Sequence, residues 1–306
     1  MGILVVGSVA FDSVETPFGV VENVLGGSAT YFATSASYFA DVSLVAVVGE
    51  DFPAEHISFL ESRNIDLRGL TRGSGKTFSW KGKYGYDLNE AQTLETKLNV
   101  FETFKPTIPD EYADAEFLFL ANIDPDLQMD VVRQVKNPRV IASDTMNYWI
   151  SSKAESLKNV IGKVDILIIN DAEARQLSQE PNLVKAARQI LSLGVKTLIV
   201  KRGEYGVLMF TGSNIFAAPA YPLEKVFDPT GAGDTFAGGF MGYLANTGNL
   251  SDAGIRQAII FGSVMASFNV EDFSLDRMRS LAYREIEERY RSFKSMTHFE
   301  GLPESA

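Results

Sequence analysis

Hydrophobic and polar residues alternate along the chain with two periods. Short apolar runs rich in β-branched residues, typical of buried parallel strands, occur at 3–9, 42–49, 116–121, 139–144, 165–170 and 196–201. Helical spacing marks 28–40, 52–63, 126–135, 151–160 and 183–193, and later 234–245, 251–268 and 275–293. An antiparallel ribbon is expected over 206–220. The alternation predicts an α/β fold, a mostly parallel doubly wound sheet covered by helices on both faces.

The segment 67–104 departs from this rhythm. It alternates with period two, as at Phe78, Trp80 and Tyr84, and has no long helical stretch. We expect it to form a small β-sheet lid together with residues 11–24, inserted into the α/β core. The whole of 1–306 is then expected to be a single domain with a lid subdomain.

Composition narrows the class of protein. The 306 residues are 45% hydrophobic and 22% charged, as in a globular protein, and no apolar run approaches the roughly 20 residues of a membrane span. The chain has no cysteine, which excludes disulfides and is compatible with a cytoplasmic protein. The net charge of −11 opposes non-specific binding to nucleic acid. We therefore expect neither nucleic acid nor membrane as a partner.

The most informative segment is 228–240, Asp-Pro-Thr-Gly-Ala-Gly-Asp-Thr-Phe-Ala-Gly-Gly-Phe. Gly231 and Gly233 allow a tight turn that presents main-chain N–H groups at the start of a helix, an arrangement that suits phosphate. Asp234 follows in the first turn. An anion-binding turn beside a carboxylate is what phosphoryl transfer to a hydroxyl requires. A helix cap is the simpler reading of an isolated Gly-x-Gly-Asp, but the full run favours chemistry.

This run resembles the carboxy-terminal motif of the ribokinase-like (PfkB) carbohydrate kinase family. Other segments fit the family's order: Asp12, Gly26-Gly27-Ser28, Asn170 to Glu173, and Lys201 to Gly206. The resemblance covers nearly the whole chain. It implies a ribokinase-like fold with a lid and ATP-dependent transfer of the γ-phosphate to a hydroxyl of a small polyhydroxylated acceptor, a sugar first of all.

The resemblance also implies roles for the residues of the motif. Asp234 would be the base, and the N–H groups of Gly231, Ala232 and Gly233 would form the anion hole. This role needs no raised pKa at Asp234, and we expect the adjacent helix terminus to favour its ionised form.

ATP and Mg²⁺ are the implied cofactors. Asn170 and Glu173 would hold Mg²⁺ through water, although a helix cap explains the same pair. Four further residues are expected near the nucleotide, namely Lys201, Gly203, Thr230 and Ser263. Asp228 and Thr230 would hold K⁺ as in many relatives, and plain turn chemistry is an equal alternative.

For the acceptor, Asp12 is the best candidate, because a carboxylate at a strand end can accept bonds from two vicinal hydroxyls. The other expected contacts are Gly26, Gly27, Ser28, Tyr31, Asn122 and Asp144. Tyr31 stands where sugar kinases of the family usually have Asn, which leaves room for a cyclitol or a nucleoside. The lid aromatics could stack on a ring or simply pack the lid.

Other functions fit less well. Gly73-Ser-Gly75-Lys76-Thr77 resembles the end of a P-loop, but Leu70 stands where its first glycine belongs and a strand is predicted after it. No Gly-x-Gly-x-x-Gly follows the first strand, which argues against an NAD-dependent enzyme. A catalytically silent metabolite-binding member remains an alternative. A homodimer through the lid edges is expected by analogy with the family.

Overall fold

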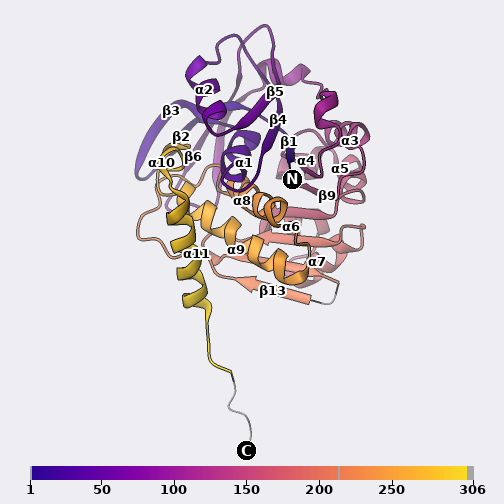
Figure 1. The fold of residues 1–306 in the computed structure, drawn as a ribbon, viewed down its shortest axis with the longest axis vertical. Helices are drawn as coiled ribbons and strands as arrows, with labels where there is room; N and C mark the ends of the chain where they lie inside the picture. The colour runs from indigo at the N-terminus through magenta and orange to yellow at the C-terminus, as the bar shows by residue number, and fades with distance from the viewer. Residues whose placement is uncertain (1, 213, 302–306) are drawn as a thin grey trace, which may run out of the picture.

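The computed structural model describes residues 2–212 and 214–301. Within them, nine strands form the central sheet in the order β13-β12-β11-β10-β9-β8-β1-β4-β5, and all neighbours are parallel except β11–β12 and β12–β13 (Figure 1). The strands are β1 (Ile3–Val6), β4 (Val42–Val48), β5 (Ile65–Arg72), β8 (Phe117–Leu120), β9 (Val140–Ser143), β10 (Ile166–Asn170), β11 (Thr197–Lys201), β12 (Val207–Thr211) and β13 (Asn214–Ala218). The predicted α/β sheet is confirmed.

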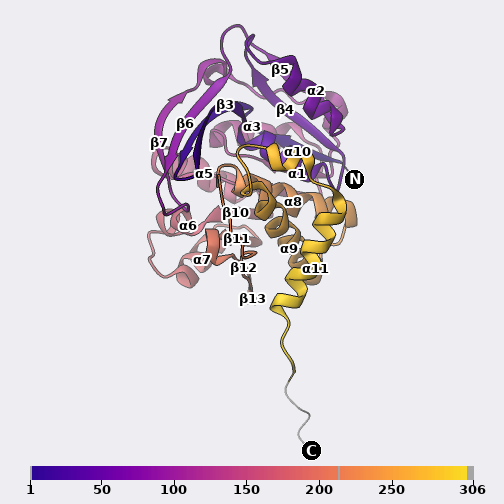
Figure 2. The ribbon, with the colours of Figure 1, turned by 90° about the vertical axis from the view of Figure 1, so that its left-hand side faces the viewer.

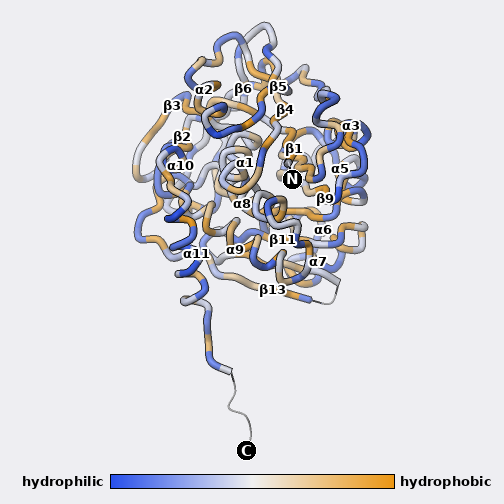
Figure 3. Tube along the Cα trace, in the orientation of Figure 1, coloured by the Kyte–Doolittle hydropathy of each residue, from blue (hydrophilic) through white to orange (hydrophobic). Residues whose placement is uncertain are grey.

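Helices cover both faces of this sheet. In β8, Phe117 and Phe119 enter one hydrophobic cluster, and Leu118 and Leu120 enter the other. The first cluster is covered by α1 (Ser28–Ala36), α2 (Ala54–Ser62), α8 (Ala232–Thr247), α9 (Asp252–Asn269), α10 (Asp276–Ser280) and α11 (Tyr283–Thr297). The second is covered by α3 (Pro125–Gln134), α4 (Asn147–Ser152), α5 (Ala154–Ile161), α6 (Asp171–Ser178) and α7 (Leu183–Leu191). Hydropathy follows this layering, with hydrophobic strands inside and polar residues over much of the surrounding helices and loops (Figure 3).

Small residues let α8 approach its neighbours closely. A Cβ at Gly238 would overlap the carbonyl of Phe32 in α1, and one at Gly239 would overlap Met265 in α9. Close backbone approach fixes the axis of α8 between these two helices. Its first turn, which carries Asp234, is therefore held in place by the core.

A second sheet of four strands, in the order β3-β2-β6-β7, forms the lid (Figure 2). Its strands are β2 (Ala10–Thr16), β3 (Gly19–Gly26), β6 (Phe78–Tyr84) and β7 (Ala91–Lys97). The expected lid boundary at residue 67 differs from the structure, because 67–72 belong to β5 at the edge of the central sheet. An edge strand is half exposed, so its polar–apolar alternation resembles that of a lid strand.

Two predicted helices are interrupted. The 151–160 pattern extends over α4 and α5, which meet at Lys153, whose ammonium group pairs with Asp124 and Asp126. The 275–293 pattern divides into α10 and α11, since Glu285 accepts a bond from the N–H of Ala282 at 2.9 Å and starts a new helix there. Short 3₁₀ turns occur at Asn99–Thr103, Asp110–Tyr112 and Gly203–Tyr205. None of the helices described is long and apolar enough to cross a membrane.

Candidate active site

The carboxyl ends of the parallel strands gather the candidate residues at one edge of the sheet. Asp144 follows β9, Asn170 ends β10 and Lys201 ends β11, three adjacent strands. In open α/β sheets this edge is where ligands bind. The start of α8 adds Asp234, which lies close enough to Asp144, Lys201 and Glu173 for their charges to act on one another.

The turn before α8 presents main-chain N–H groups. Gly231 is the N-cap with φ 73, a left-handed conformation that favours glycine. Among the described residues, the N–H groups of Gly231 and Gly233 donate to no acceptor, so both are available to an anion. Ala232 differs from the expectation, because its N–H donates to the carbonyl of Pro229 at 3.1 Å. The N–H of Asp234 faces the carboxylate of the same residue and lowers its pKa.

A buried network holds this turn in shape. The two oxygens of Asp228 accept the N–H groups of Thr230 at 2.9 Å and of Ser274 at 3.2 Å. Asn269, which the sequence analysis missed, is fully buried on α9; it donates to the carbonyl of Thr230 at 2.9 Å and accepts from the Thr235 hydroxyl at 3.1 Å. These bonds give Asp228 a structural role, because its carboxylate holds the turn in shape. The potassium site stays a prediction.

Lys201 is the cation that faces the acidic groups. Its Nζ would lie 2.5 Å from a Cβ placed on Gly233, so the ammonium group sits at the turn of residues 228–234, called the anion-binding turn here after its predicted role. Burial raises the pKa of Asp234 to about 6, and Lys201 opposes that rise. The sequence analysis allowed for the helix terminus, which favours the ionised form of Asp234, and not for desolvation, which disfavours it. At neutral pH the carboxylate form still predominates.

Asn170 and Glu173 form a reciprocal cap at the start of α6. The Asn170 side chain accepts the N–H of Glu173, and Glu173 Oε2 accepts the N–H of Asn170, both at 2.8 Å. The pair can cap the helix and also bind Mg²⁺, since no bond within the described residues engages the other oxygen of Glu173. One free carboxylate oxygen fits Mg²⁺, an ion that keeps most of its water shell. No group of three or more acidic or histidine ligands occurs in the described chain.

Asp12 lies buried at the base of the lid, on the other side of the turn. It accepts a bond from the main chain of Gly27, and a Cβ at Gly26 would overlap its carboxylate. Burial, with the charge of Asp228 second, raises the pKa of Asp12 to about 7. The hydroxyl of Tyr31, also buried, faces this carboxyl group, while its ring packs against Gly231. Tyr31 thus lies between Asp12 and the turn at Gly231.

The remaining candidate ligand-binding residues are described here by their contacts within the protein. The N–H of Ser28 donates to the Ser8 hydroxyl at 3.0 Å, which ties the start of α1 to the segment between β1 and β2. Asn122 accepts the indole N–H of Trp149 at 3.0 Å, leaving its amide nitrogen for a ligand. Gly203 has φ 53 and contacts Asn89 of the lid, and Ser263 is half-buried on α9. Their roles toward a ligand stay predictions.

The three lid aromatics do different things. Phe78 stacks on Phe101 with ring centroids 5.3 Å apart and so packs the base of the lid. Tyr84 is buried, and its hydroxyl accepts from Thr230 at 3.3 Å, a contact between the lid and the anion-binding turn. Trp80 is half-buried; its ring covers Gly82 and its N–H donates to Thr93 at 3.2 Å.

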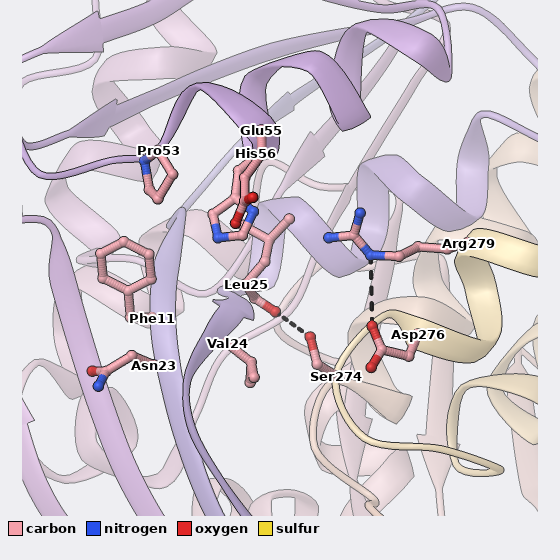
Figure 4. A pocket seen from close by; sticks show the side chains of 10 residues that line it. All are labelled: Phe11, Asn23, Val24, Leu25, Pro53, Glu55, His56, Ser274, Asp276 and Arg279. Carbon is pink, nitrogen blue, oxygen red and sulfur yellow. Dashed lines mark hydrogen bonds and ion pairs between the residues drawn. The ribbon is translucent and has the colours of Figure 1, made fainter.

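A cavity of about 500 Å³ lies near the site but is separate from it (Figure 4). Phe11 lines this cavity, and successive residues of a strand point to opposite faces, so Asp12 faces the other way. Ser274 joins the two sides: its hydroxyl donates to the carbonyl of Leu25, which also lines the cavity, at 2.6 Å, and its N–H donates to Asp228 of the turn at 3.2 Å. Asp12 therefore lies on the opposite face of β2 from this cavity.

The segment from Gly73 to Thr77 that resembles the end of a P-loop is a structural turn. No helix follows Thr77, which instead precedes β6. The N–H and hydroxyl of Thr77 both donate to Asp51 at 2.7 Å.

Fold and site together define an α/β phosphotransferase with a lid, one that transfers phosphate to an alcohol group. Residues 3–279 match the pfkB family of carbohydrate kinases. The chain belongs to this family, whose members use ATP and Mg²⁺.

Individual relatives are similar to different extents. A cytidine kinase of Thermococcus kodakarensis is 33% identical over 247 residues, which cover 79% of this chain and 87% of that protein. A ribokinase of Staphylococcus aureus is 32% identical over 124 residues, 39% of each chain. The fold also matches a putative ribokinase II of E. coli solved in complex with ATP and Mg²⁺, with TM-score 0.76 and 19% identity over 95% of this chain and 99% of that one.

Proposed function

We propose that the chain is an ATP-dependent nucleoside kinase that phosphorylates a primary hydroxyl of the acceptor's ribose. One observation carries the proposal. Trp80 of β6 is the direct cross-strand partner of Asp12 of β2, so indole and carboxylate lie on the same face of the lid. A nucleoside needs both groups, because its ribose carries a vicinal diol for the carboxylate and its base has a flat face for the indole.

The relatives support this reading. The cytidine kinase aligns with most of the chain, whereas the ribokinase aligns with about two fifths of it. Tyr31 supports it as well, since it replaces the small Asn expected of a sugar kinase with a buried ring. A free sugar or a cyclitol would use Asp12 but has no flat base to stack on the Trp80 indole.

The reaction would proceed as follows. Asp234 accepts the proton of the attacking hydroxyl as its oxygen bonds to the γ-phosphorus and the bond to the leaving ADP breaks. The N–H groups of Gly231 and Gly233 and the ammonium of Lys201 stabilise charge on the transferring group. Mg²⁺, when bound through Glu173 and Asn170, would neutralise phosphate charge.

A coupled ADP-release assay tests the proposal with cytidine, other nucleosides, free ribose, hexoses and inositol as acceptors. We expect turnover with at least one nucleoside at a lower KM than with ribose. Trp80→Ala should raise the nucleoside KM roughly ten- to a hundredfold, the range of base stacking, and leave the KM for ribose unchanged. Thr96 of β7 is the cross-strand neighbour of Trp80, so Thr96→Ala is the matched control and should behave like the wild type.

Turnover of free sugars or inositol alone would reject the nucleoside and leave a kinase. Silence with every acceptor, despite tight ATP binding, would favour the metabolite-binding alternative.

A further inference from the structure

Gly82 is a glycine in the interior of a lid strand. It lies in β6, between β2 and β7 in the middle of the lid (Figure 2). Glycine weakens a strand, and it often marks a place where another group approaches the backbone closely. Here that group is the Trp80 indole: a Cβ on Gly82 would lie 2.0, 2.3 and 2.8 Å from its Cη2, Cζ2 and Cζ3. These distances place the Cβ against the face of the ring, so the indole fills the space of a side chain at residue 82.

The neighbouring strand β7 is bulged where it meets the indole. Its pairing with β6 shifts register between Lys81 and Gly82. Gly82 consequently pairs with Thr93, and Leu94 is the extra residue of a β-bulge. A bulge re-aims the side chains of its strand. In a regular ladder Leu94 would stand beside Gly82; instead the Thr93 hydroxyl stands there and accepts the indole N–H of Trp80 at 3.2 Å.

The face of β6 that carries the indole is turned toward the candidate site. Trp80, Gly82 and Tyr84 share this face, whereas the two lysines between them are exposed. Tyr84 contacts Thr230 of the anion-binding turn, and Asp12 is the cross-strand partner of Trp80. Trp80 is half-buried with one ring face against Gly82, so its exposed part is the other face and the ring edge. A flat ring of a ligand that reaches Asp12 can stack there.

We propose that Gly82 and Thr93 are positioning residues for base recognition: the missing side chain of Gly82 and the hydroxyl of Thr93 hold the Trp80 indole against the lid and present its free face to the nucleobase. These three residues form the indole platform. The inference rests on the proposed nucleoside kinase function and deepens it. A larger residue at position 82 would lift the indole into the space that the base needs. Gly82 and Thr93 thus set specificity through Trp80.

Gly82→Ala tests the space over β6, and Gly85→Ala is its matched control. A Cβ at Gly85 would meet no atom within 4 Å. Gly82→Ala should raise the nucleoside KM roughly ten- to a hundredfold, the range of base stacking, with kcat and the KM for ribose within about twofold of wild type. Gly85→Ala should match the wild type with both acceptors.

Thr93→Val tests the hydrogen bond without crowding the indole. Valine keeps the size and the β-branching of threonine, so β7 should fold as before. The nucleoside KM should rise roughly two- to tenfold, as expected for one neutral hydrogen bond, and the ribose KM should not change. Thr93→Ser restores the hydroxyl and should return the nucleoside KM to that of the wild type. This pair decides the matter if Gly82→Ala does not fold.

Fluorescence observes the indole without turnover. The chain has two tryptophans, so Trp149→Phe leaves Trp80 as the emitting residue. In that background Gly82→Ala should shift the emission maximum to longer wavelength and raise the acrylamide quenching constant, because the indole is lifted into solvent. Gly85→Ala should change neither. Cytidine added without ATP should quench the emission of Trp80 in the background protein, since a stacked base covers the free face of the ring.

The outcomes separate the platform from the kinase. Quenching by cytidine without phosphate transfer to any acceptor would keep the indole platform and reject the kinase function. Nucleoside turnover with wild-type KM values in Gly82→Ala and Thr93→Val would keep the kinase and overturn the platform. An indole over a strand glycine can also serve only to shield the backbone. Equal KM rises for nucleoside and ribose, or a changed Tm with both KM values unchanged, would indicate that structural role and overturn the inference.

Discussion

The two glycines of the anion-binding turn should fail in different ways when replaced by alanine. Gly231 has φ 73, a conformation that costs an L residue about 1–2 kcal/mol. Its new Cβ would also overlap the ring of Tyr31, which is 1% exposed and cannot retreat, so overpacking adds about 1–3 kcal/mol. Gly231→Ala should therefore lose about 2–5 kcal/mol of unfolding free energy.

Gly233→Ala is the matched variant. Gly233 lies inside α8, and its Cβ would meet Lys201 Nζ at 2.5 Å, the far end of a flexible side chain that can move. Stability should stay close to that of the wild type. The displaced ammonium group leaves the anion-binding turn, so kcat should fall roughly a hundredfold, as when one donor to a transition-state anion is lost.

Thermal unfolding and the ADP-release assay measure both effects. An unfolding entropy of about 2.1 cal/mol/K per residue converts the loss in Gly231→Ala into a Tm decrease of about 3–8 °C. A Gly231→Ala protein that melts and turns over like the wild type would refute the left-handed turn against Tyr31. Equal Tm losses in the two variants would refute the contrast between a packed ring and a mobile lysine.

Two further predictions concern the acids. Asp234→Asn should fold and bind ATP but lose roughly 10²–10⁴-fold in kcat, and kcat of the wild type should fall below pH of about 6, where Asp234 becomes protonated; a variant with near-normal turnover would refute the base. For Asp12 the folded pKa of about 7 exceeds the usual 3.8, so its stabilising contribution is complete below pH of about 4 and is lost as pH rises through 7. Asp12→Asn should therefore raise Tm at pH 8, but not at pH 4, and impair acceptor binding; equal Tm changes at both pH values would contradict the shift.

The parts of the fold that local patterns encode could be predicted from sequence. Apolar runs predict the buried strands, and a fixed order of glycines and acids predicts the turn at Gly231. The edge strand β5 could not be told from a lid strand, because its Ile65 and Gly69 are buried and most of its other residues are not. Alternation reports exposure, not the sheet to which a strand belongs.

The supporting residues of the site were beyond reach for a different reason. Asn269 of α9 donates a hydrogen bond to the carbonyl of Thr230, 39 positions away, and Gln128 of α3 donates one to the carbonyl of Asp144, 16 positions away. Neither residue stands in a local motif. Both look like ordinary polar residues of helices until the helices pack. The same holds for the pKa of Asp234, since desolvation depends on what the lid and the neighbouring strands cover.

Burial explains why the pKa values of the acids at the site are raised. Asp12, Asp144, Asp228, Asp234 and Glu173 all have raised pKa values, and burial is the largest cause for each. Within the described residues, Lys201 is the cation that faces three of them. An anionic nucleotide would therefore meet a single cationic side chain at these acids, Lys201, and would depend otherwise on main-chain N–H groups and on the Mg²⁺ that accompanies it.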